Sequence, residues 1–166
     1  PFLKDDQLII FKSTLPVGTT ENLYRKILSK NRNIRVAFCP ERLAEGQAIK
    51  ELLSYPMVVG GVDEKSKQRA VKFWESSLEI DVIGVSSTAA AELVKLADNL
   101  WIDLSIALAN DLAKLADNLP QKIDVLEVIT AANSLPKGQH NVNILEPSIG
   151  VGGYCLTKDP WILHNM

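Results

Sequence analysis

The stretch SSTAAAELVKLADNLWIDLSIALANDLAKLADNL, residues 86–119, is typical of one very long helix, and it decides how the chain is organised. Its apolar residues recur three and four positions apart, it begins with helix-capping Ser and Thr residues, and it contains no Gly or Pro. At 1.5 Å per residue, about thirty helical residues span roughly 45 Å, which is longer than a small domain needs. We therefore expect this helix to link two domains or to build a subunit interface.

Within this stretch the hexapeptide KLADNL occurs twice, at 95–100 and at 114–119. Successive helical residues are about 100° apart around the axis, so the two copies point in directions roughly 100° apart. Both copies cannot face the same cleft. We therefore expect at most one of them to be functional.

Upstream of the long helix, extended and helical patterns alternate. Four apolar, β-branched runs predict strands, at 8–14, 33–40, 55–62 and 80–85. Two amphipathic segments predict helices, at 20–30 and 63–78, the second with Phe73 and Trp74 on its apolar side. Strands that alternate with helices predict an α/β fold with a parallel sheet covered by helices.

Ligands of such sheets bind beyond the carboxyl ends of the strands. This rule points to Ser13, Thr14, Pro40 and Glu41. Glu41 and Glu45 lie four positions apart near a strand end, which suits a general acid and base. Two solvated loop carboxylates would give the same pattern.

A second candidate site lies in GVGGYCLTKDPWIL, residues 150–163, downstream of a further predicted helix at 122–133. Its glycines allow left-handed backbone and close approach of a ligand. Cys155 would stand in the first turn of a helix beside Lys158, where helix N–H groups and a positive charge favour a thiolate. Asp159 would lie one helical turn further on and could hold a water or accept a proton. Taken alone, the pattern fits a buried, inert cysteine equally well.

The composition sets further limits. The chain has 166 residues, 46% of them hydrophobic, and a net charge of −2, with no basic patch for nucleic acid. The most apolar run is interrupted by Asp103, so no membrane span is expected. Cys39 and Cys155 lie too far apart in sequence to suggest a disulfide framework, which favours a cytoplasmic setting. His140 and His164 have no partners at metal-ligand spacing, so no metal is expected.

Four motifs follow one another along the chain: KSTLPVGTT at 12–20, CPERLAEGQAIKEL with LSYPMVVGG at 39–61, AAELVKLADNLWIDLSIALANDLA at 90–113, and GVGGYCLTKDPWIL at 150–163. In this order they resemble the UDP-sugar 6-dehydrogenase family, which includes UDP-glucose and UDP-N-acetylhexosamine dehydrogenases. The resemblance covers nearly the whole chain.

This resemblance implies an organisation. Residues 1–84 are expected to form the C-terminal half of an NAD-binding Rossmann domain, with a Rossmann-like parallel sheet. Residues 85–166 are expected to form the central helical domain, whose long helix builds a homodimer. The GxGxxG half and the C-terminal UDP-binding domain are not in this stretch, so we expect the stretch alone to be inactive.

The resemblance also implies a reaction. The family oxidises the C6 hydroxyl of a UDP-sugar to a carboxylate, in two hydride transfers to two NAD⁺, without releasing the aldehyde. A thiolate that adds to the aldehyde forms a thiohemiacetal, and oxidation of this adduct gives a thioester that water hydrolyses.

The motifs assign roles to individual residues. Cys155 matches the nucleophile, and Lys95 and Asn99 match the pair that stabilises the negative oxygen on C6. The first KLADNL copy is the matching one, because Ala91 and Glu92 precede it as in the family motif.

Other positions match supporting roles. Thr14 and Asp159 match residues that position water and assist the first deprotonation, Glu45 matches an acid/base carboxylate, and Glu41 matches its companion. The residues expected near the cofactor are Ser13, Thr14, Glu45 and Lys158. The residues expected at the substrate are Glu41, Arg42, Lys95, Asn99, Gly152 and Gly153.

Substrate choice and reaction class leave alternatives open. PER, KDPW and LSYPMVVGG favour UDP-N-acetylmannosamine or UDP-N-acetylglucosamine, whereas Lys158 followed by Asp159 is the UDP-glucose form. Single-oxidation enzymes of the 6-phosphogluconate or 3-hydroxyacid type share a long central helix, but they need neither a GGYC motif nor the Glu41 and Glu45 pair. A purely structural dimerisation module is the third alternative.

Overall fold

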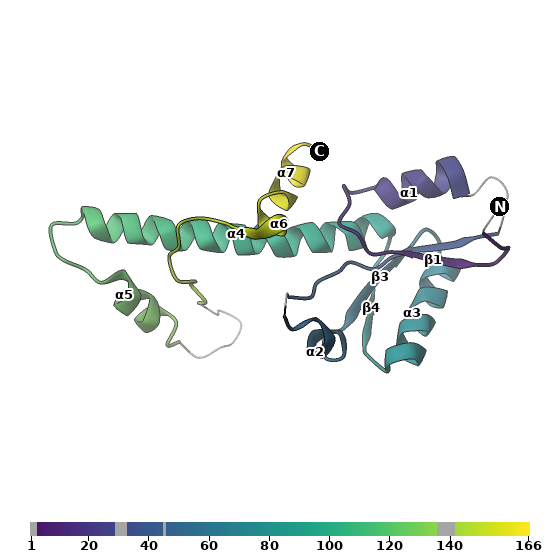
Figure 1. Ribbon diagram of the computed structural model, residues 1–166, viewed down its shortest axis with the longest axis horizontal. Coiled ribbons are helices and arrows are strands. Elements are labelled where there is room, and N and C mark those ends of the chain that lie inside the picture. Colours follow the sequence, from purple (N-terminus) through teal and green to yellow (C-terminus); the bar gives the residue numbers. More distant parts are fainter. Residues whose placement is uncertain (1–2, 29–32, 45, 136–141) are drawn as a thin grey trace. The chain divides into compact units, whose positions relative to one another are not determined.

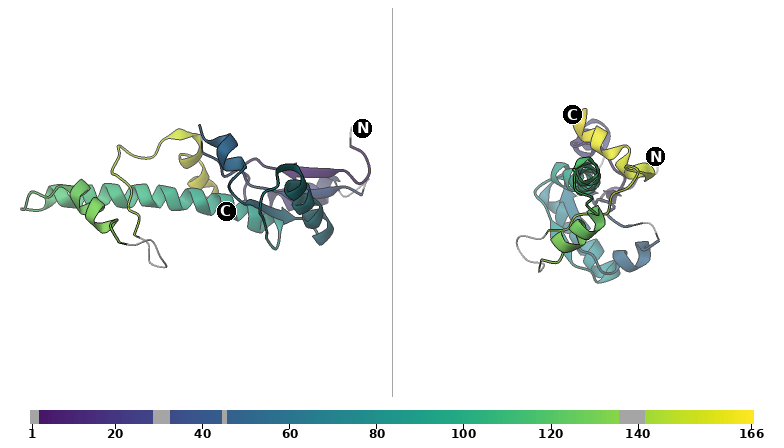
Figure 2. Two further views of the ribbon diagram at one scale, coloured as in Figure 1. Left: turned by 90° about the horizontal axis from the view of Figure 1, so that it is seen from below. Right: turned by 90° about the vertical axis from the view of Figure 1, so that its left-hand side faces the viewer.

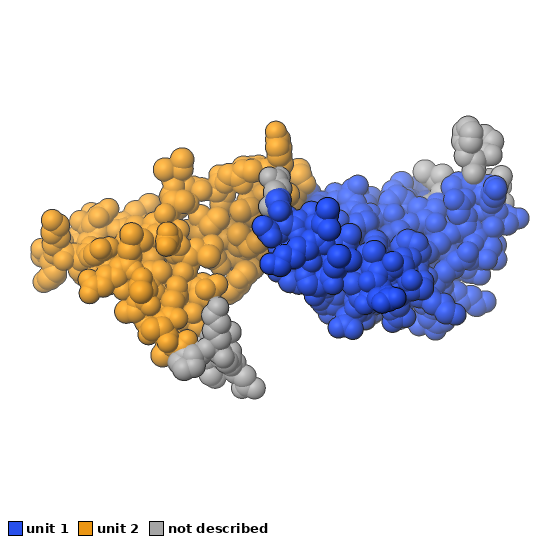
Figure 3. Space-filling view, turned by 60° about the horizontal axis from the view of Figure 1, so that its bottom comes forward, with its two compact units in different colours: residues 1–97, 162–166 blue, residues 98–161 orange. Residues whose placement is uncertain are grey.

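The computed structural model describes residues 3–28, 33–44, 46–135 and 142–166. The chain forms two compact units, which Figure 3 shows in different colours. Unit 1 comprises residues 1–97 and 162–166, and unit 2 comprises residues 98–161. The domain boundary predicted after residue 84 stays a prediction.

Unit 1 contains a four-stranded sheet in the order β1-β2-β3-β4 (Figure 1). Its strands are β1 (Leu8–Phe11), β2 (Arg35–Phe38), β3 (Met57–Gly61) and β4 (Val82–Gly84). Strand β1 pairs in parallel with β2, and β3 in parallel with β4. These strands and the helices between them confirm the predicted α/β class.

The sheet is mixed and not parallel throughout, because β3 runs antiparallel to β2. A parallel crossover needs a connecting segment that packs across the face of the sheet, usually a helix. In the described part of the connection from 39 to 56, the one helix is α2 (Ala48–Leu52), which has five residues, and no residue of α2 is buried. The chain therefore turns back beside β2 in the opposite direction.

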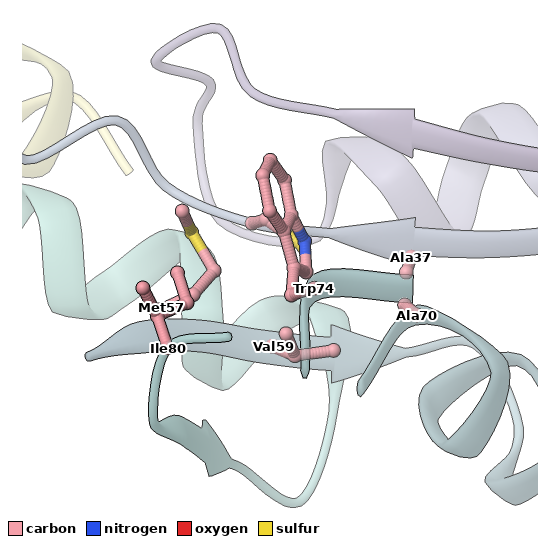
Figure 4. Packing of buried hydrophobic residues seen from close by; sticks show 7 residues of the cluster. Ala37, Met57, Val59, Ala70, Trp74 and Ile80 are labelled. Carbon is pink, nitrogen blue, oxygen red and sulfur yellow. The ribbon is translucent and has the colours of Figure 1, made fainter. Parts of the chain in front are cut away.

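Helix α3 (Glu64–Leu78) covers one face of the sheet and closes the core. The carboxylate of Asp63 caps this helix by accepting the backbone N–H of Ser66 at 2.6 Å. Figure 4 shows Trp74 of α3 packed among side chains of β2 and β3, with Val59 and Ala37 close to it. Phe73 is exposed, so its predicted place on the apolar side is wrong. Neighbouring helical residues point about 100° apart, and only Trp74 can face the sheet.

Two further helical segments were predicted, one before β2 and one after β4, and the structure contains helices in both regions. Helix α1 (Thr19–Leu23) is continued by the π-helical turn η1 (Tyr24–Leu28), in the region where a helix was predicted. The long predicted helix is also present, as α4 (Thr88–Asn118), which has 31 residues. Figure 2 shows α4 as one uninterrupted helix.

The start of α4 packs against the sheet through a glycine. A Cβ atom on Gly60 of β3 would lie 2.1 Å from the carbonyl oxygen of Ser87, so only glycine allows this approach. The hydroxyl of Ser87 in turn caps α4 by accepting the backbone N–H of Ala90 at 3.1 Å. The segment that begins α4 is thereby held on β3, within unit 1.

In unit 2 the chain reverses after α4, and helix α5 (Val125–Ala132) folds back beside it. Figures 1 and 2 both show the following segment running back along α4 towards the short helix α6 (Gly153–Leu156). The side chain of Asn133 holds this segment at Ile144 through two hydrogen bonds of 2.8 Å. Its amide group donates to the carbonyl oxygen of Ile144, and its Oδ1 accepts the backbone N–H of Ile144.

The helix predicted to carry both Cys155 and Asp159 is interrupted. Helix α6 ends at Leu156, and α7 (Asp159–His164) begins only after a turn. Pro160 has no backbone N–H and fits the first turn of a helix, so the chain stops and starts a new helix there. Cys155 and Asp159 therefore do not lie on consecutive turns of one helix.

Candidate functional site

The carboxyl edge of β1 and β2 carries the first group of candidate residues. Because the two strands are parallel, the residues that follow them lie at the same edge of the sheet. The ammonium group of Lys12 forms an ion pair of 3.4 Å with the carboxylate of Glu41, which joins the two strand ends. Ser13 is exposed and Thr14 is half-buried at this edge.

Glu41 is fixed by more than this ion pair. Its Oε1 accepts the backbone N–H groups of Arg42, at 3.0 Å, and of Leu43, at 3.2 Å. Arg42 itself is exposed. Glu45, the second carboxylate of the predicted acid/base pair, lies outside the described residues.

Lys12 is a residue that the sequence reasoning missed. Its ammonium group lies 4.9 Å from the ring centre of Trp74 and 3.8 Å from the sulfur of Met57. The aromatic ring and the carboxylate of Glu41 both attract this charge. A lysine directly after an apolar strand, in the KST triplet, was the available signal.

A buried carboxylate connects the start of α1 to α4 within unit 1. Glu92 is 1% exposed, and it accepts the backbone N–H groups of Gly18, at 2.5 Å, and Thr20, at 2.8 Å. Its Oε1 also accepts the hydroxyl of Thr20 at 2.7 Å. These bonds satisfy N–H groups that the first turn of α1 would otherwise leave unpaired. The loop that carries Thr14 is therefore held at its far end by α4.

The two KLADNL copies have different surroundings. Asn99, in the first copy, is 5% exposed, and Lys95 one turn before it is half-buried. In the second copy the exposed ammonium group of Lys114 pairs with Asp111 at 3.1 Å, and the amide of Asn118 bonds only locally, to the carbonyl oxygen of Lys114. The second copy is therefore a solvated helix surface.

Asn99 and Asp159 bring two distant motifs together inside unit 2. The amide Nδ2 of Asn99 donates to Oδ2 of Asp159 at 2.5 Å. Asp159 is 0% exposed, and its other carboxylate oxygen pairs with the ammonium group of Lys158. A buried carboxylate is thus paired with a cation and oriented by an amide, and both contacts are charge-assisted.

Cys155 precedes Asp159 by four residues and follows a bend that is rich in glycine. Gly150 and Gly153 have φ angles of 134° and 76°, in the region that glycine favours, and Gly152 is extended. Cys155 itself is exposed on α6, so the interpretation as a buried, inert cysteine does not hold for it.

The other cysteine has different surroundings. Cys39 is buried in the core, where the indole N–H of Trp74 donates to its sulfur at 3.3 Å. Burial raises the pKa of the Cys39 thiol to about 11, against the opposing effects of the Trp74 hydrogen bond and the Lys12 charge. Cys39 is therefore a protonated core residue.

Two further observations concern the described residues as a whole. They contain no group of three His, Cys, Asp or Glu side chains arranged to hold a metal ion. His140 lies outside the described residues. None of the helices in the described ranges is both long and apolar enough to cross a membrane.

Comparison with known families gives two matches that together cover most of the chain. Residues 1–78 match the NAD binding domain of the UDP-glucose/GDP-mannose dehydrogenase family. Residues 89–166 match the central domain of the same family. The first match confirms the predicted cofactor, NAD, and the Rossmann-like character of the fold.

Individual relatives agree with this result. The UDP-N-acetyl-D-mannosamine dehydrogenase of Methanocaldococcus jannaschii is 45% identical over 163 residues, which cover 98% of this chain and 36% of that protein. A solved structure of the UDP-D-ManNAc dehydrogenase from Pyrococcus horikoshii superposes with a TM-score of 0.83 at 39% identity, over 93% of this chain and 37% of the other.

A UDP-glucose dehydrogenase from Pyrobaculum islandicum has the same fold, with a TM-score of 0.82 at 28% identity, over 95% of this chain and 36% of the other. The chain thus spans about a third of the length of the relatives that it matches.

Proposed function

The chain belongs to the UDP-glucose/GDP-mannose dehydrogenase family, and from this premise we propose that it serves the NAD-dependent oxidation of a UDP-sugar. The reaction converts the C6 hydroxyl of the sugar to a carboxylate in two successive oxidations. The observation that carries the proposal is the hydrogen bond between Asn99 and the buried Asp159, because it joins the KLADN and GGYCLTKD motifs.

The carboxyl edge of β1 and β2 fits a dinucleotide cofactor. Its side chains include the hydroxyls of Ser13 and Thr14, which are groups that hydrogen-bond riboses and a carboxamide. We assign four residues to the cofactor: Ser13, Thr14, Glu45 and Lys158. NAD⁺, when bound, supplies a hydride acceptor for each of the two oxidations.

In the first oxidation the C6 carbon loses a hydride, and the hydroxyl that it carries loses a proton. We assign the acceptance of this proton to water, and we assign to Thr14 and to Asp159 a role in positioning water and assisting this deprotonation. Lys95 and Asn99 then face negative charge on the C6 oxygen, as a cation and an amide donor. Their spacing of one turn on α4 and the burial of Asn99 support these roles.

Cys155 carries the second oxidation. Its thiolate adds to the aldehyde carbon, and the adduct is a thiohemiacetal that can lose the second hydride. The resulting thioester is hydrolysed by water, which releases the carboxylate and regenerates the thiol. Glu45 and Glu41 serve as the acid/base carboxylate and its companion in this step. The exposed position of Cys155 on α6 supports its access to a substrate.

The remaining assignments concern the sugar. Six residues are proposed to contact it: Glu41, Arg42, Lys95, Asn99, Gly152 and Gly153. The two glycines lie on the bend before Cys155, where a bare backbone allows close approach of a ligand.

We propose a UDP-N-acetylhexosamine, and specifically UDP-N-acetylmannosamine, as the sugar. The support is the name and 45% identity of the relative from Methanocaldococcus jannaschii, together with the PER and KDPW sequences of this chain. UDP-glucose is the alternative, because a UDP-glucose dehydrogenase has the same fold.

The enzyme is proposed to act as a homodimer in the cytoplasm. An apolar stripe with members three, four and seven positions apart lies exposed on the second half of α4: Trp101, Leu104, Leu108 and Leu115. Such a stripe on one helix face suits the seam between two copies of α4. The free thiols of Cys39 and Cys155 fit a reducing compartment.

The substrate assignment is tested by following NADH formation by the full-length protein with UDP-N-acetylmannosamine, UDP-N-acetylglucosamine and UDP-glucose. We expect the largest kcat/KM for UDP-N-acetylmannosamine. A larger kcat/KM for UDP-glucose would contradict the substrate assignment and identify the protein as a UDP-glucose dehydrogenase. The absence of NADH with all three sugars would contradict the proposed function.

A further inference from the structure

We propose that Asn110 is a positioning residue for Cys155, because it ties one end of the Cys155 segment to α4 while Asn99 ties the other. The side-chain Oδ1 of Asn110 accepts the backbone N–H of Ser148 at 2.8 Å. The amide of Asn99 donates to Asp159 at 2.5 Å. Cys155 lies between these two attachment points, all within unit 2. The consequence for catalysis rests on the function proposed above.

The two asparagines occupy one face of α4. They are eleven positions apart, and eleven residues of α-helix make three full turns with about 20° left over. Their separation along the axis is roughly 16 Å. The segment 148–159 therefore runs back along this face, which is the course that Figures 1 and 2 show for it.

The segment between the anchors is much longer than the distance that it must cover. Eleven residues of extended chain reach roughly 36 to 40 Å, more than twice the separation of the two asparagines. The excess is taken up by the short helix α6 and by the bend at Gly150 and Gly153, whose φ angles are 134° and 76°. Glycine has more backbone freedom than any other residue, so many other paths would be open to a loosely attached segment.

Apolar packing does little to select one path. Ile149, Val151 and Tyr154 are all exposed, and Tyr154 is 90% exposed. The hydroxyl of Ser148 bonds only within the bend, to the carbonyl oxygen of Gly150 at 3.1 Å. The polar anchors at the two ends therefore select the position of the thiol.

Loss of the Asn110 anchor should misplace the nucleophile without removing it. A displacement of about 1 Å of a reacting group can cost about a hundredfold in rate. Because Asn110 accepts a hydrogen bond, an aspartate at this position keeps the acceptor oxygen while an alanine does not. This difference separates the anchor from a general packing role of the side chain.

The test compares Asn110→Ala, Asn110→Asp and Asn118→Ala with the parent in the full-length protein. Asn118 is the matched control, because it is an exposed asparagine of the same helix, and its side-chain amide bonds locally, to the carbonyl oxygen of Lys114. The first readout is amide hydrogen exchange of a peptide spanning 146–156, with a peptide from α3 as the check that the variants are folded. The second readout is kcat and KM in the NADH assay.

For Asn110→Ala we expect exchange in 146–156 to accelerate about tenfold and kcat to fall about ten- to a hundredfold, with KM for NAD⁺ changed less than about threefold. Asn110→Asp should restore most of both properties, and Asn118→Ala should resemble the parent. Unchanged exchange in Asn110→Ala, or equal loss in Asn110→Ala and Asn110→Asp, would overturn the proposal. If the parent protein forms no NADH, the proposed function fails, while the exchange comparison still decides whether Asn110 anchors the segment.

Discussion

Asn99 and Asp159 are joined by a hydrogen bond of 2.5 Å, although 60 positions separate them in sequence. Both side chains are buried, and the second oxygen of Asp159 is paired with Lys158. The bond connects the helix that carries the first KLADNL copy to the segment that carries Cys155. Changes at either residue should therefore affect stability and catalysis together.

Asn99→Asp should destabilise the protein strongly at neutral pH. The substitution places a second carboxylate at hydrogen-bonding distance from Asp159 in a buried site, and like charges there repel. We expect a loss of about 2 to 4 kcal/mol in the free energy of unfolding at pH 7.

Chemical denaturation at pH 7 measures this effect, with Asn118→Asp as the exposed control. The control should change the free energy of unfolding by no more than about 0.5 kcal/mol. Equal stabilities of the two variants would show that the bond between Asn99 and Asp159 does not hold in the protein.

Lys95→Ala should reduce kcat/KM far more than Lys114→Ala. Lys95 lies in the first KLADNL copy, one turn before the buried Asn99, whereas Lys114 is an exposed residue that pairs with Asp111. Removal of a group that stabilises a negative oxygen costs about a hundredfold or more in rate. Steady-state kinetics of the two variants provides the comparison. Similar losses in both would mean that the first copy has no special role.

Glu92→Gln should lower stability, because Glu92 caps α1 from α4 with three hydrogen bonds. The amide has only one acceptor oxygen, and its NH₂ group would face N–H donors. We expect a cost of about 2 to 4 kcal/mol, from lost charge-assisted bonds and from buried donors without acceptors.

Glu21→Gln is the matched control for this variant. Glu21 lies on α1 itself and pairs with the exposed guanidinium group of Arg25 at 2.8 Å. Exposed pairs of this kind contribute less than about 1 kcal/mol. Thermal melting of both variants measures the difference, and a Glu92→Gln protein as stable as the control would refute the capping role.

The buried thiol of Cys39 should make the free energy of unfolding fall at alkaline pH. Its pKa is raised from 9.0 to about 11 in the folded protein, chiefly by burial. Below pH 9 the thiol is protonated in both states, so its contribution is fully present. Between pH 9 and about 11 only the unfolded chain loses the proton, so stability falls as the pH rises, by about 2 to 3 kcal/mol in total.

The Cys39→Ala variant isolates this contribution. Its free energy of unfolding should fall less steeply between pH 9 and 11 than that of the parent, whatever its stability at pH 7. Identical slopes in urea denaturation across that range would contradict the assignment of a buried, protonated thiol.

Much of the fold follows from local patterns in the sequence. The apolar spacing of residues 88–118 predicts α4, because a helix depends on residues three and four positions apart. The strands at Leu8–Phe11 and Met57–Gly61 follow in the same way from β-branched runs. The different surroundings of the two KLADNL copies agree with the prediction, from helix geometry, that they cannot share a cleft.

Features that depend on distant residues could not be predicted in this way. The antiparallel course of β3 depends on how the connection from 39 to 56 packs. The contacts of Glu92 with α1 and of Asn110 with Ser148 join residues 38 or more positions apart. No local pattern specifies such pairs, because polar residues on a helix are most often solvated. Pro160 in the sequence already indicated that a helix could be interrupted near Asp159. That Cys155 and Asp159 consequently lie on two different helices was seen only in the structure.

The measurement that tests the central claim most directly is the number of NADH formed per UDP-N-acetylmannosamine consumed, by the full-length protein and by its Cys155→Ser variant. The parent should form two NADH per sugar and release the carboxylate. The variant should form at most one, because a serine hydroxyl is a much weaker nucleophile than a thiolate and cannot carry the second oxidation at a comparable rate. Two NADH per sugar and normal acid release from the variant would contradict the role of Cys155 and, with it, the proposed mechanism.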